Sequence, residues 1–199
     1  MVSGIILAAG ESSRMGSPKA LLKIGGKSFV QHIVDVFIAS RVLDIVVVLG
    51  ADDEAIKTQL NWFKGKTVVN KEWKKGQLSS ILTGLRAVDQ EDLHGVLIWP
   101  VDRPLVTQHV IVGMLHQFWT KHKQIVVPIF SGQRGHPVLI GRSLFEELER
   151  APKEMGARTV LWDHPKDVLE YKTEEEGVVI NIDSAEDYQK YVGNRAELS

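Results

Sequence analysis

The feature that most constrains the fold of this chain is a regular alternation between short apolar runs and longer segments with helical spacing. Residues 4–9, GIILAA, are continuously apolar, and residues 44–50, DIVVVLG, form a β-branched run that starts at Asp44 and ends at Gly50. Between these runs, residues 29–40 place apolar side chains at helical intervals. Continuous apolar runs of this length predict strands that are buried on both faces of a sheet.

The alternation continues through the middle of the chain. The same patterns predict strands at 67–70, 95–102 and 124–130 and helices at 52–63, 79–88 and 110–119. Parallel strands need a long crossover, which is usually a helix, so this order predicts a mostly parallel sheet with helices on both faces. The predicted fold class is therefore α/β, with a doubly wound sheet.

Beyond about residue 131 the predicted elements are shorter and richer in turns. The patterns there predict a loop and short strand at 131–141, a strand at 177–183 and helices at 143–151, 156–164 and 184–192. Ser143 is expected to cap the first of these helices. Because no linker-like stretch interrupts the chain, we expect one domain over residues 1–199, with a small C-terminal lobe.

Composition narrows the classes of partner. The chain has 199 residues, 24 basic and 25 acidic side chains and no cysteine. A net charge of −1 gives no electrostatic footprint for nucleic acid, and the lack of cysteine excludes disulfides and thiolate-bound zinc. No apolar run approaches the roughly 20 residues that span a bilayer, and the apolar start lacks the basic region of a signal peptide. We therefore expect no nucleic-acid or membrane partner, and a cytoplasmic location.

Two familiar phosphate-binding patterns do not fit. The stretch GGKS at 25–28 resembles the end of a P-loop, but that motif needs a glycine five residues before Gly26, where this chain has Leu21. The dinucleotide pattern GxGxxG also fails, because no glycine follows Gly10 until Gly16. We expect GGKS to be a turn before a helix.

The loop after the first predicted strand is a better candidate for binding an anion. Ala8, Ala9 and Gly10 are small enough to let a ligand approach the backbone, and Arg14 and Lys19 supply positive charge. In a doubly wound sheet this loop would lie near the loops at 70–77 and 101–104, since each follows a strand. A plain surface loop with two solvated cations is the alternative.

Aspartates follow two other predicted strands. Asp102 in WPVDRP ends a buried strand, where a carboxylate is costly unless it is paired or bound to a metal such as Mg²⁺. Asp183 in NIDSAED is placed in the same way. The alternatives are a capped turn for Asp102 and a helix cap for Asp183. For His136, in the RGHP loop, a structural role is at least as well supported as a catalytic one.

Together these motifs resemble the MobA-like nucleotidyltransferases, and most closely their molybdenum-cofactor cytidylyltransferase branch. The matching segments, in the family's order, are LAAGESSRMGSPKALL at 7–22, NKEWKKGQLSSI at 70–81, PVDRP at 100–104, RGHPVL at 134–139, GAR at 156–158 and NIDSAEDY at 181–188. The resemblance covers nearly the whole chain, and its first motif is highly specific. It implies a Rossmann-like nucleotidyltransferase fold, in which residues 1–105 mainly bind nucleotide and residues 106–199 mainly bind the acceptor.

The resemblance also implies a role for each motif. The base and ribose would lie against Leu7, Ala8, Ala9 and Gly10, and a second loop near the base would present Ser79 and Ser80. The triphosphate would be held by Arg14 and Lys19, which act in catalysis with Asp102. The implied cofactor, Mg²⁺, would be bound by Asp102 and Asp183. The acceptor would be bound by Arg134, Gly135, His136 and Arg158.

Two details of the resemblance bear on the substrates. The guanylyltransferase branch usually shows LAGG and a DK pair, whereas this chain has LAAG at 7–10 and Pro18 before Lys19, which favours CTP. The cytidylyltransferase branch often carries Gly-Asp before GAR, where this chain has Lys153 and Glu154. Glu154 keeps the charge on a longer arm, so it puts the identity of the acceptor in question.

The implied function is transfer of CMP from CTP to the phosphate of a molybdopterin-type acceptor, with release of pyrophosphate. A molybdenum hydroxylase apo-enzyme is a candidate partner. One alternative is the same chemistry on a sugar phosphate or another phosphorylated alcohol. Another is a non-catalytic maturation factor that binds the cofactor and hands it over. The presence of both Asp102 and Asp183 favours an enzyme.

Overall fold

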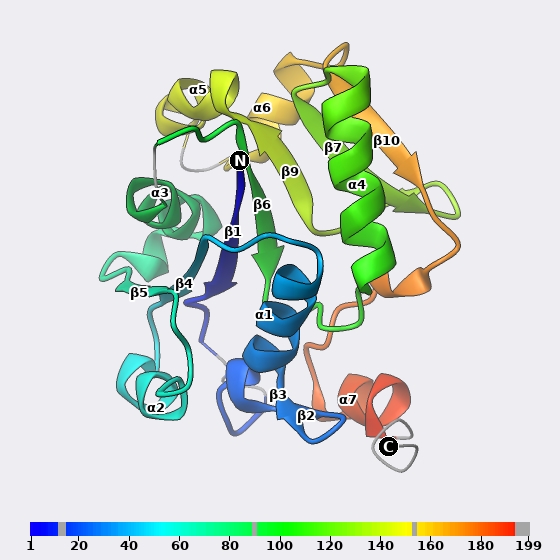
Figure 1. The fold of residues 1–199 in the computed structure, drawn as a ribbon. Helices are drawn as coiled ribbons and strands as arrows, with labels where there is room; N and C mark the ends of the chain where they lie inside the picture. The colour runs from blue at the N-terminus through cyan, green and yellow to red at the C-terminus, as the bar shows by residue number, and fades with distance from the viewer. Residues whose placement is uncertain (12–14, 89–90, 153–154, 194–199) are drawn as a thin grey trace.

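The computed structural model describes residues 1–11, 15–88, 91–152 and 155–193 (Figure 1). The main sheet contains β1 (Val2–Ala8), β4 (Ile45–Leu49), β5 (Lys66–Val69), β6 (Gly95–Pro100), β7 (Ile125–Phe130), β8 (Gln133–Arg134), β9 (Val138–Gly141) and β10 (Val168–Lys172). The helices are α1 (Phe29–Ala39), α2 (Asp53–Gln59), α3 (Gln77–Ala87), α4 (Gln108–Lys121), α5 (Phe145–Arg150), α6 (Arg158–Asp163) and α7 (Ala185–Tyr191). Through residue 130 this order follows the predicted alternation.

The sheet is mostly parallel, as predicted. Its strands lie in the order β10-β7-β9-β6-β1-β4-β5, with β8 paired to β7. β1 runs parallel to both β4 and β6, and β5 runs parallel to β4. β9 runs antiparallel to both β6 and β7, and β10 is a parallel edge strand beside β7. Strands from both halves of the chain therefore belong to one sheet.

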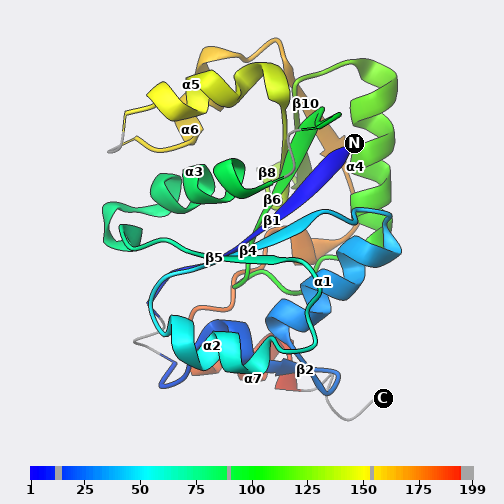
Figure 2. The ribbon, with the colours of Figure 1, turned by 60° about the vertical axis from the view of Figure 1, so that its left-hand side comes forward.

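Helices cover both faces of this sheet. Successive side chains of β1 point to opposite sides, so Ile6 packs in the apolar cluster under α1 and α4, and Ile5 packs in the cluster under α3, α5 and α6. Figure 2 shows these two helical layers on either side of the strands. Burial on both faces explains why the central strands are continuously apolar in sequence.

The predicted strand at 177–183 is wrong. A 3-10 turn spans Glu176–Val178, Val179 continues it as a turn, and residues 180–183 are not assigned to a strand. Its apolar side chains are nevertheless buried in the core at Val178, Ile180 and Ile182. The alternating pattern thus reflects burial of every second side chain against the core and not a hydrogen-bonded strand ladder.

Two further details of the C-terminal region differ from expectation. Ser143 does not cap α5, because it lies within a 3-10 turn at Arg142–Leu144 and its Oγ donates to Gln124 Oε1 at 2.7 Å. β10 has no counterpart among the predicted elements, since this edge strand is partly exposed and carries charged side chains.

The GGKS stretch is a turn before a helix, as predicted. Its glycines lie between the short paired strands β2 (Lys23–Ile24) and β3 (Lys27–Ser28), and Ser28 Oγ accepts a hydrogen bond from Gln31 N at the start of α1. Within the described part of the chain, none of the helices combines the length and apolar character needed to cross a bilayer.

Candidate functional site

The carboxyl end of β1 is fixed between the loops that follow its two neighbouring strands. Val101 N donates to Leu7 O at 3.0 Å, and Ala51 N donates to Ala9 O at 3.1 Å. The side chains of residues 7–9 are buried. The backbone at this point is therefore held from both sides, as a rigid ligand-binding loop requires.

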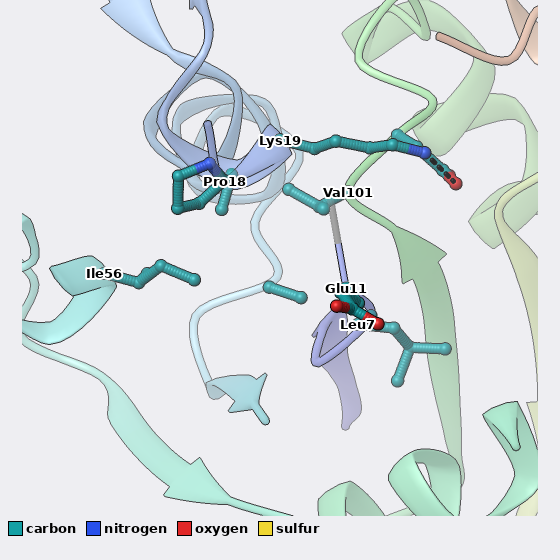
Figure 3. A pocket seen from close by; sticks show the side chains of 10 residues that line it. Leu7, Glu11, Pro18, Lys19, Ile56 and Val101 are labelled. Carbon is teal, nitrogen blue, oxygen red and sulfur yellow. Dashed lines mark ion pairs between the residues drawn. The ribbon is translucent and has the colours of Figure 1, made fainter. Parts of the chain in front are cut away.

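A cavity lies beside this end of β1 (Figure 3). It has a volume of about 390 Å³, including space open to solvent, and its lining includes the predicted site residues Leu7, Ala8, Gly10, Lys19 and Asp102. A Cβ built on Gly10 would meet no atom of the described residues within 4 Å, so these residues leave room beside the backbone there. The structure thus brings together residues that the sequence assigned to nucleotide, phosphate and metal.

Three predicted or questioned positions lie outside the described residues. They are Arg14, expected to hold the triphosphate, and the pair Lys153 and Glu154, which bears on the acceptor. Their roles stay predictions.

Lys19 connects the two carboxylates that were predicted to bind metal. It begins a 3-10 turn (Lys19–Leu21), and its ammonium donates a hydrogen bond to Asp183 Oδ1. The same Nζ lies 3.8 Å from Asp102 Oδ2. Because the Lys19 side chain is only 15% exposed, water screens these charges less than it screens a surface pair. Residues from the start, middle and end of the chain thus form one charged cluster.

The surroundings of Asp102 shift the pKa of its carboxyl group. Burial raises its pKa, the positive charges of Lys19 and Arg103 lower it in part, and the negative charge of Asp183 raises it further. Its Oδ1 is buried and has no hydrogen-bond partner among the described residues. Burying a carboxylate oxygen without a hydrogen-bond donor costs free energy. This oxygen is therefore suited to binding a cation that accompanies a ligand.

The carboxylates fit a magnesium site of the kind that substrate phosphates complete. The described residues contain no group of three or more histidine, cysteine, aspartate or glutamate side chains that could hold a metal by themselves. Mg²⁺ usually takes only one or two protein carboxylates, with phosphate oxygens and waters filling its remaining positions. Asp102 and Asp183, which share one ammonium, meet that requirement.

Asp183 is placed by residues 178–183, a segment that we call the C-terminal strap. Arg103 Nη1 donates to Val179 O at 3.1 Å, and Ile182 N donates to Asp102 O at 2.8 Å. These bonds tie the strap to the turn that carries Asp102. The helix cap considered for Asp183 belongs instead to Ser184, which forms a capping box at the start of α7.

Arg103 and Asn181 support this arrangement, and neither is among the predicted site residues. Asn181 Nδ2 donates to Asp183 Oδ2 at 2.5 Å, which leaves Asp183 Oδ1 directed at Lys19. Burial lowers the pKa of Arg103, while Asp102 and Asp183 raise it in part. Both residues lie inside motifs noticed in the sequence. A place inside these motifs is only a weak sequence signal for a functional role. Arg103 binds a backbone carbonyl and Asn181 binds a carboxylate, and both contacts depend on the fold.

The acceptor motif forms a tight turn against the C-terminal strap. His136 N donates to Val178 O at 2.9 Å, and the His136–Pro137 peptide bond is cis. A Cβ at Gly135 would lie 2.3 Å from Val178 O, so only glycine fits there. The turn that carries the predicted acceptor residues and the turn that carries Asp102 thus hold the same segment.

His136 is a neutral side chain in this turn. Burial, reinforced by the positive charges of Arg103 and Arg158, lowers its pKa to about 4. Its Nδ1 is buried without a hydrogen-bond partner among the described residues. Two arginines were predicted to bind the acceptor. The positive charge of Arg158, at the start of α6, acts on this ring. Arg134 is exposed and forms an ion pair with Glu170 of β10 at 2.8 Å.

Ser79 and Ser80 lie at the start of α3 and are organised by Asn70, a residue not singled out in the sequence. Asn70 is buried beyond β5, and its Nδ2 donates to Ser79 Oγ at 2.8 Å and to Ser80 Oγ at 3.0 Å. Neither serine belongs to the lining of the cavity beside β1. Their contact with the base stays a prediction.

Comparison with known proteins gives a family and a fold. Residues 4–168 match the MobA-like NTP transferase domain. A nicotine blue oxidoreductase of Paenarthrobacter nicotinovorans is 29% identical over 175 residues, which cover 82% of this chain and 83% of that protein. A probable molybdenum cofactor guanylyltransferase of Bacillus cereus is 31% identical over 163 residues, which cover 77% of each chain.

Solved structures share the whole fold at low identity. Rv0371c from Mycobacterium tuberculosis superposes with a TM-score of 0.84 at 23% identity, over 96% of this chain and 98% of that one. A nucleotidyl transferase from Methanothermobacter gives 0.81 at 20% identity, over 100% and 99%. Since the domain match spans most of the sequence, the chain belongs to the MobA-like NTP transferase family, as a nucleotidyltransferase related to proteins named molybdenum cofactor guanylyltransferase.

Proposed function

We propose that the protein transfers a nucleoside monophosphate from an NTP, with CTP as the favoured donor, to the phosphate of a molybdopterin-type acceptor. The reaction depends on Mg²⁺ and releases pyrophosphate. The observation that carries this proposal is the cluster of Lys19, Asp102 and Asp183 beside the cavity at the end of β1. Cations and metal-binding carboxylates in one place are what a reaction between two phosphate groups needs.

Both reactants are anions, so their mutual repulsion is the main barrier. The acceptor phosphate has a second pKa of about 6 and is mostly ionised at pH 7. One of its oxygens attacks the α-phosphorus of the NTP, and the bond from that phosphorus to the β-phosphate oxygen breaks with its electrons leaving on pyrophosphate. No general base is required, which agrees with a His136 that is neutral at pH 7 and suited to hydrogen bonding with the acceptor.

The chain's own groups have distinct roles in this scheme. Asp102 and Asp183 would hold the metal, and Lys19 with Arg14 would hold the triphosphate. When bound, Mg²⁺ neutralises charge on the phosphates and helps to align them. Arg103 fixes the C-terminal strap and so keeps Asp183 opposite Asp102.

The first test measures pyrophosphate release with molybdopterin, or its molybdenum form, together with NTP and Mg²⁺. We expect Asp102→Asn to lower kcat by at least about 10²-fold, because it removes charge that acts at the reacting phosphates. Asp35→Asn is the matched control, since Asp35 of α1 forms an exposed pair with Lys27 of β3 and its substitution should leave the rate unchanged. Undiminished release by Asp102→Asn would overturn the assignment.

The donor is tested by comparing CTP, GTP, ATP and UTP, with the product identified by mass. CTP is favoured by LAAG at 7–10 and by Pro18, whereas the relatives named guanylyltransferase favour GTP. We expect the highest kcat/KM with CTP. A clear preference for GTP would change the assigned donor from CTP to GTP and would leave the proposed nucleotidyl transfer unchanged.

The same assays separate the other candidate functions. Turnover with a sugar phosphate or another phosphorylated alcohol, and none with molybdopterin, would replace the acceptor. Tight pterin binding without NTP turnover would indicate a maturation factor. Because one relative is named an oxidoreductase, the protein should also be assayed for oxidation of NADH and NADPH with a redox dye. Redox turnover without any NTP reaction would overturn the proposal.

A further inference from the structure

Lys19 occupies the region that a metal ion on the two carboxylates would need. Its Nζ hydrogen bonds to Asp183 Oδ1 and lies 3.8 Å from Asp102 Oδ2 (a dashed line marks an ion pair of Lys19 in Figure 3). Mg²⁺ would require carboxylate oxygens at about 2.1 Å. An ammonium in contact with both carboxylates and a divalent ion between them would repel each other at short range, so the two cannot bind there together.

The hydrogen bonds around Asp183 leave the same one of its oxygens for the Lys19 ammonium and for a metal ion. Asn181 Nδ2 donates a hydrogen bond to Asp183 Oδ2. Asp183 Oδ1 is therefore the oxygen that faces Lys19 and that a metal would need. The side chains of Asp102 and Asp183 are 28% and 34% exposed, which limits screening by water. The ammonium and the metal therefore compete for Asp183 Oδ1, while at Asp102 the ammonium lies at Oδ2 and Oδ1 is the oxygen without a partner among the described residues.

A nucleotide changes this competition. Lys19 has a flexible four-carbon stem and lines the same cavity as Gly10 and Glu11, so its ammonium can reach a triphosphate bound there. Among the described residues the metal finds only the two carboxylates as ligands in this cluster. The triphosphate adds further oxygen ligands. Nucleotide binding thus supplies a new partner for Lys19 and new ligands for Mg²⁺ at once.

We propose that Lys19 is an internal counter-ion of the metal site, which holds Asp102 and Asp183 until Mg²⁺ arrives with the nucleotide and then moves to the triphosphate. This inference rests on the proposed function, because it takes the same two carboxylates as metal ligands. Its consequence is positive coupling: the protein binds a divalent ion weakly alone and strongly with NTP. Lys19 thereby sets the order of binding as well as holding phosphate.

The test measures Mn²⁺ binding to the nucleotide-free protein by electron paramagnetic resonance. Lys19→Met and Lys19→Gln remove the competing charge, so we expect each to bind Mn²⁺ at least about tenfold more tightly than the wild type. Lys27→Met removes the same charge from an exposed pair and should bind Mn²⁺ as the wild type does. Asp102→Asn should lose the binding. Thermal unfolding identifies any variant that is not folded.

The outcomes distinguish this inference from the proposed function. If Asp102→Asn loses Mn²⁺ binding but neither folded Lys19 variant gains affinity, the counter-ion role is overturned and the metal site stands. Equal tightening by Lys27→Met would also overturn it, because the effect would then be one of net charge. If Asp102→Asn binds Mn²⁺ like the wild type, the metal site itself fails, and the inference with it.

A second measurement needs no variant. Wild-type crystals soaked with Mn²⁺ alone, or with Mn²⁺ and a non-hydrolysable CTP analogue, would show the metal by anomalous scattering. We expect metal on Asp102 and Asp183 only with the nucleotide, and Lys19 then on a phosphate. Metal between the carboxylates while Lys19 still contacts both would overturn the proposal.

Discussion

Asp102, His136 and Asn181 each bury a polar atom that has no hydrogen-bond partner among the described residues. All three lie on the C-terminal strap or on the two turns that hold it. Buried polar atoms are almost always satisfied in proteins, so each unsatisfied one calls for a reason such as a catalytic role or a bound ion. At the scale of single residues, the site is therefore marked by incomplete hydrogen bonding as much as by charge.

His136 gives a prediction about stability in acid. Its pKa is about 4 in the folded protein and 6.5 in the reference state. Between these values the unfolded chain binds a proton that the folded protein does not, so stability falls as the pH drops from about 6.5 to about 4. The full shift corresponds to roughly 3 kcal/mol. We expect His136→Gln to lose less stability than the wild type between about pH 7 and pH 4.5, measured by urea unfolding.

The exposed His109 of α4 supplies the control for that experiment. His109→Gln should lose as much stability in acid as the wild type does. An equal loss in His136→Gln would mean that protonation of His136 does not contribute to acid sensitivity.

At the scale of elements, α7 anchors the end of the C-terminal strap. Ser184 Oγ accepts from Asp187 N at 3.1 Å, and Ser184 N donates to Asp187 Oδ2 at 2.9 Å. Tyr188 of the same helix stacks on Phe29 and donates its hydroxyl to Lys23 O at 2.6 Å. Because Ser184 directly follows Asp183, the capping box fixes the chain where the site ends.

We expect Ser184→Ala to lower the free energy of unfolding by about 1 kcal/mol, the usual cost of losing such a cap. Urea unfolding at neutral pH measures it. Ser143→Ala is the comparison, since Ser143 caps no helix and is exposed; it should change stability by less than about 0.5 kcal/mol. The opposite ranking of the two variants would contradict the observed caps.

At the scale of the whole molecule, the site joins parts of the chain that are far apart in sequence. The ion pair between Lys19 and Asp183 spans 164 positions, and both ends depend on the central sheet. A ligand that binds across this site stabilises only the folded state, so its binding energy adds to the stability of the entire domain.

This linkage predicts that Mg²⁺ and CTP raise the free energy of unfolding by about 2.7 kcal/mol at a free concentration of one hundred times Kd. Asp102→Asn should keep the part due to CTP alone and lose the part that needs Mg²⁺. Thermal or urea unfolding with each ligand alone and with both measures these parts. Failure of every NTP to stabilise the wild type would contradict nucleotide binding.

The pattern of apolar residues was sufficient to predict the strands that are buried on both faces of the sheet. Residues 4–9 and 44–50 read as buried strands because helices cover both faces of the sheet, and the structure confirms them as β1 and β4. The same reasoning failed at 177–183, where one buried face gives the alternation of a strand without a neighbouring strand. Periodicity reports burial, and pairing depends on what lies beside the chain.

By itself the sequence determined the α/β class and the family, and it placed the loops of Lys19 and Asp102 at one edge, because strand order in a doubly wound sheet directs those loops there. Asp183 follows no strand, so its place beside them depends on the tertiary structure. Only the tertiary structure decided that one ammonium joins both carboxylates, that Arg103 holds Val179, and that His136 is neutral. The physical reason is that contacts and burial between distant segments depend on the path of the C-terminal strap, which no local pattern of side chains encodes.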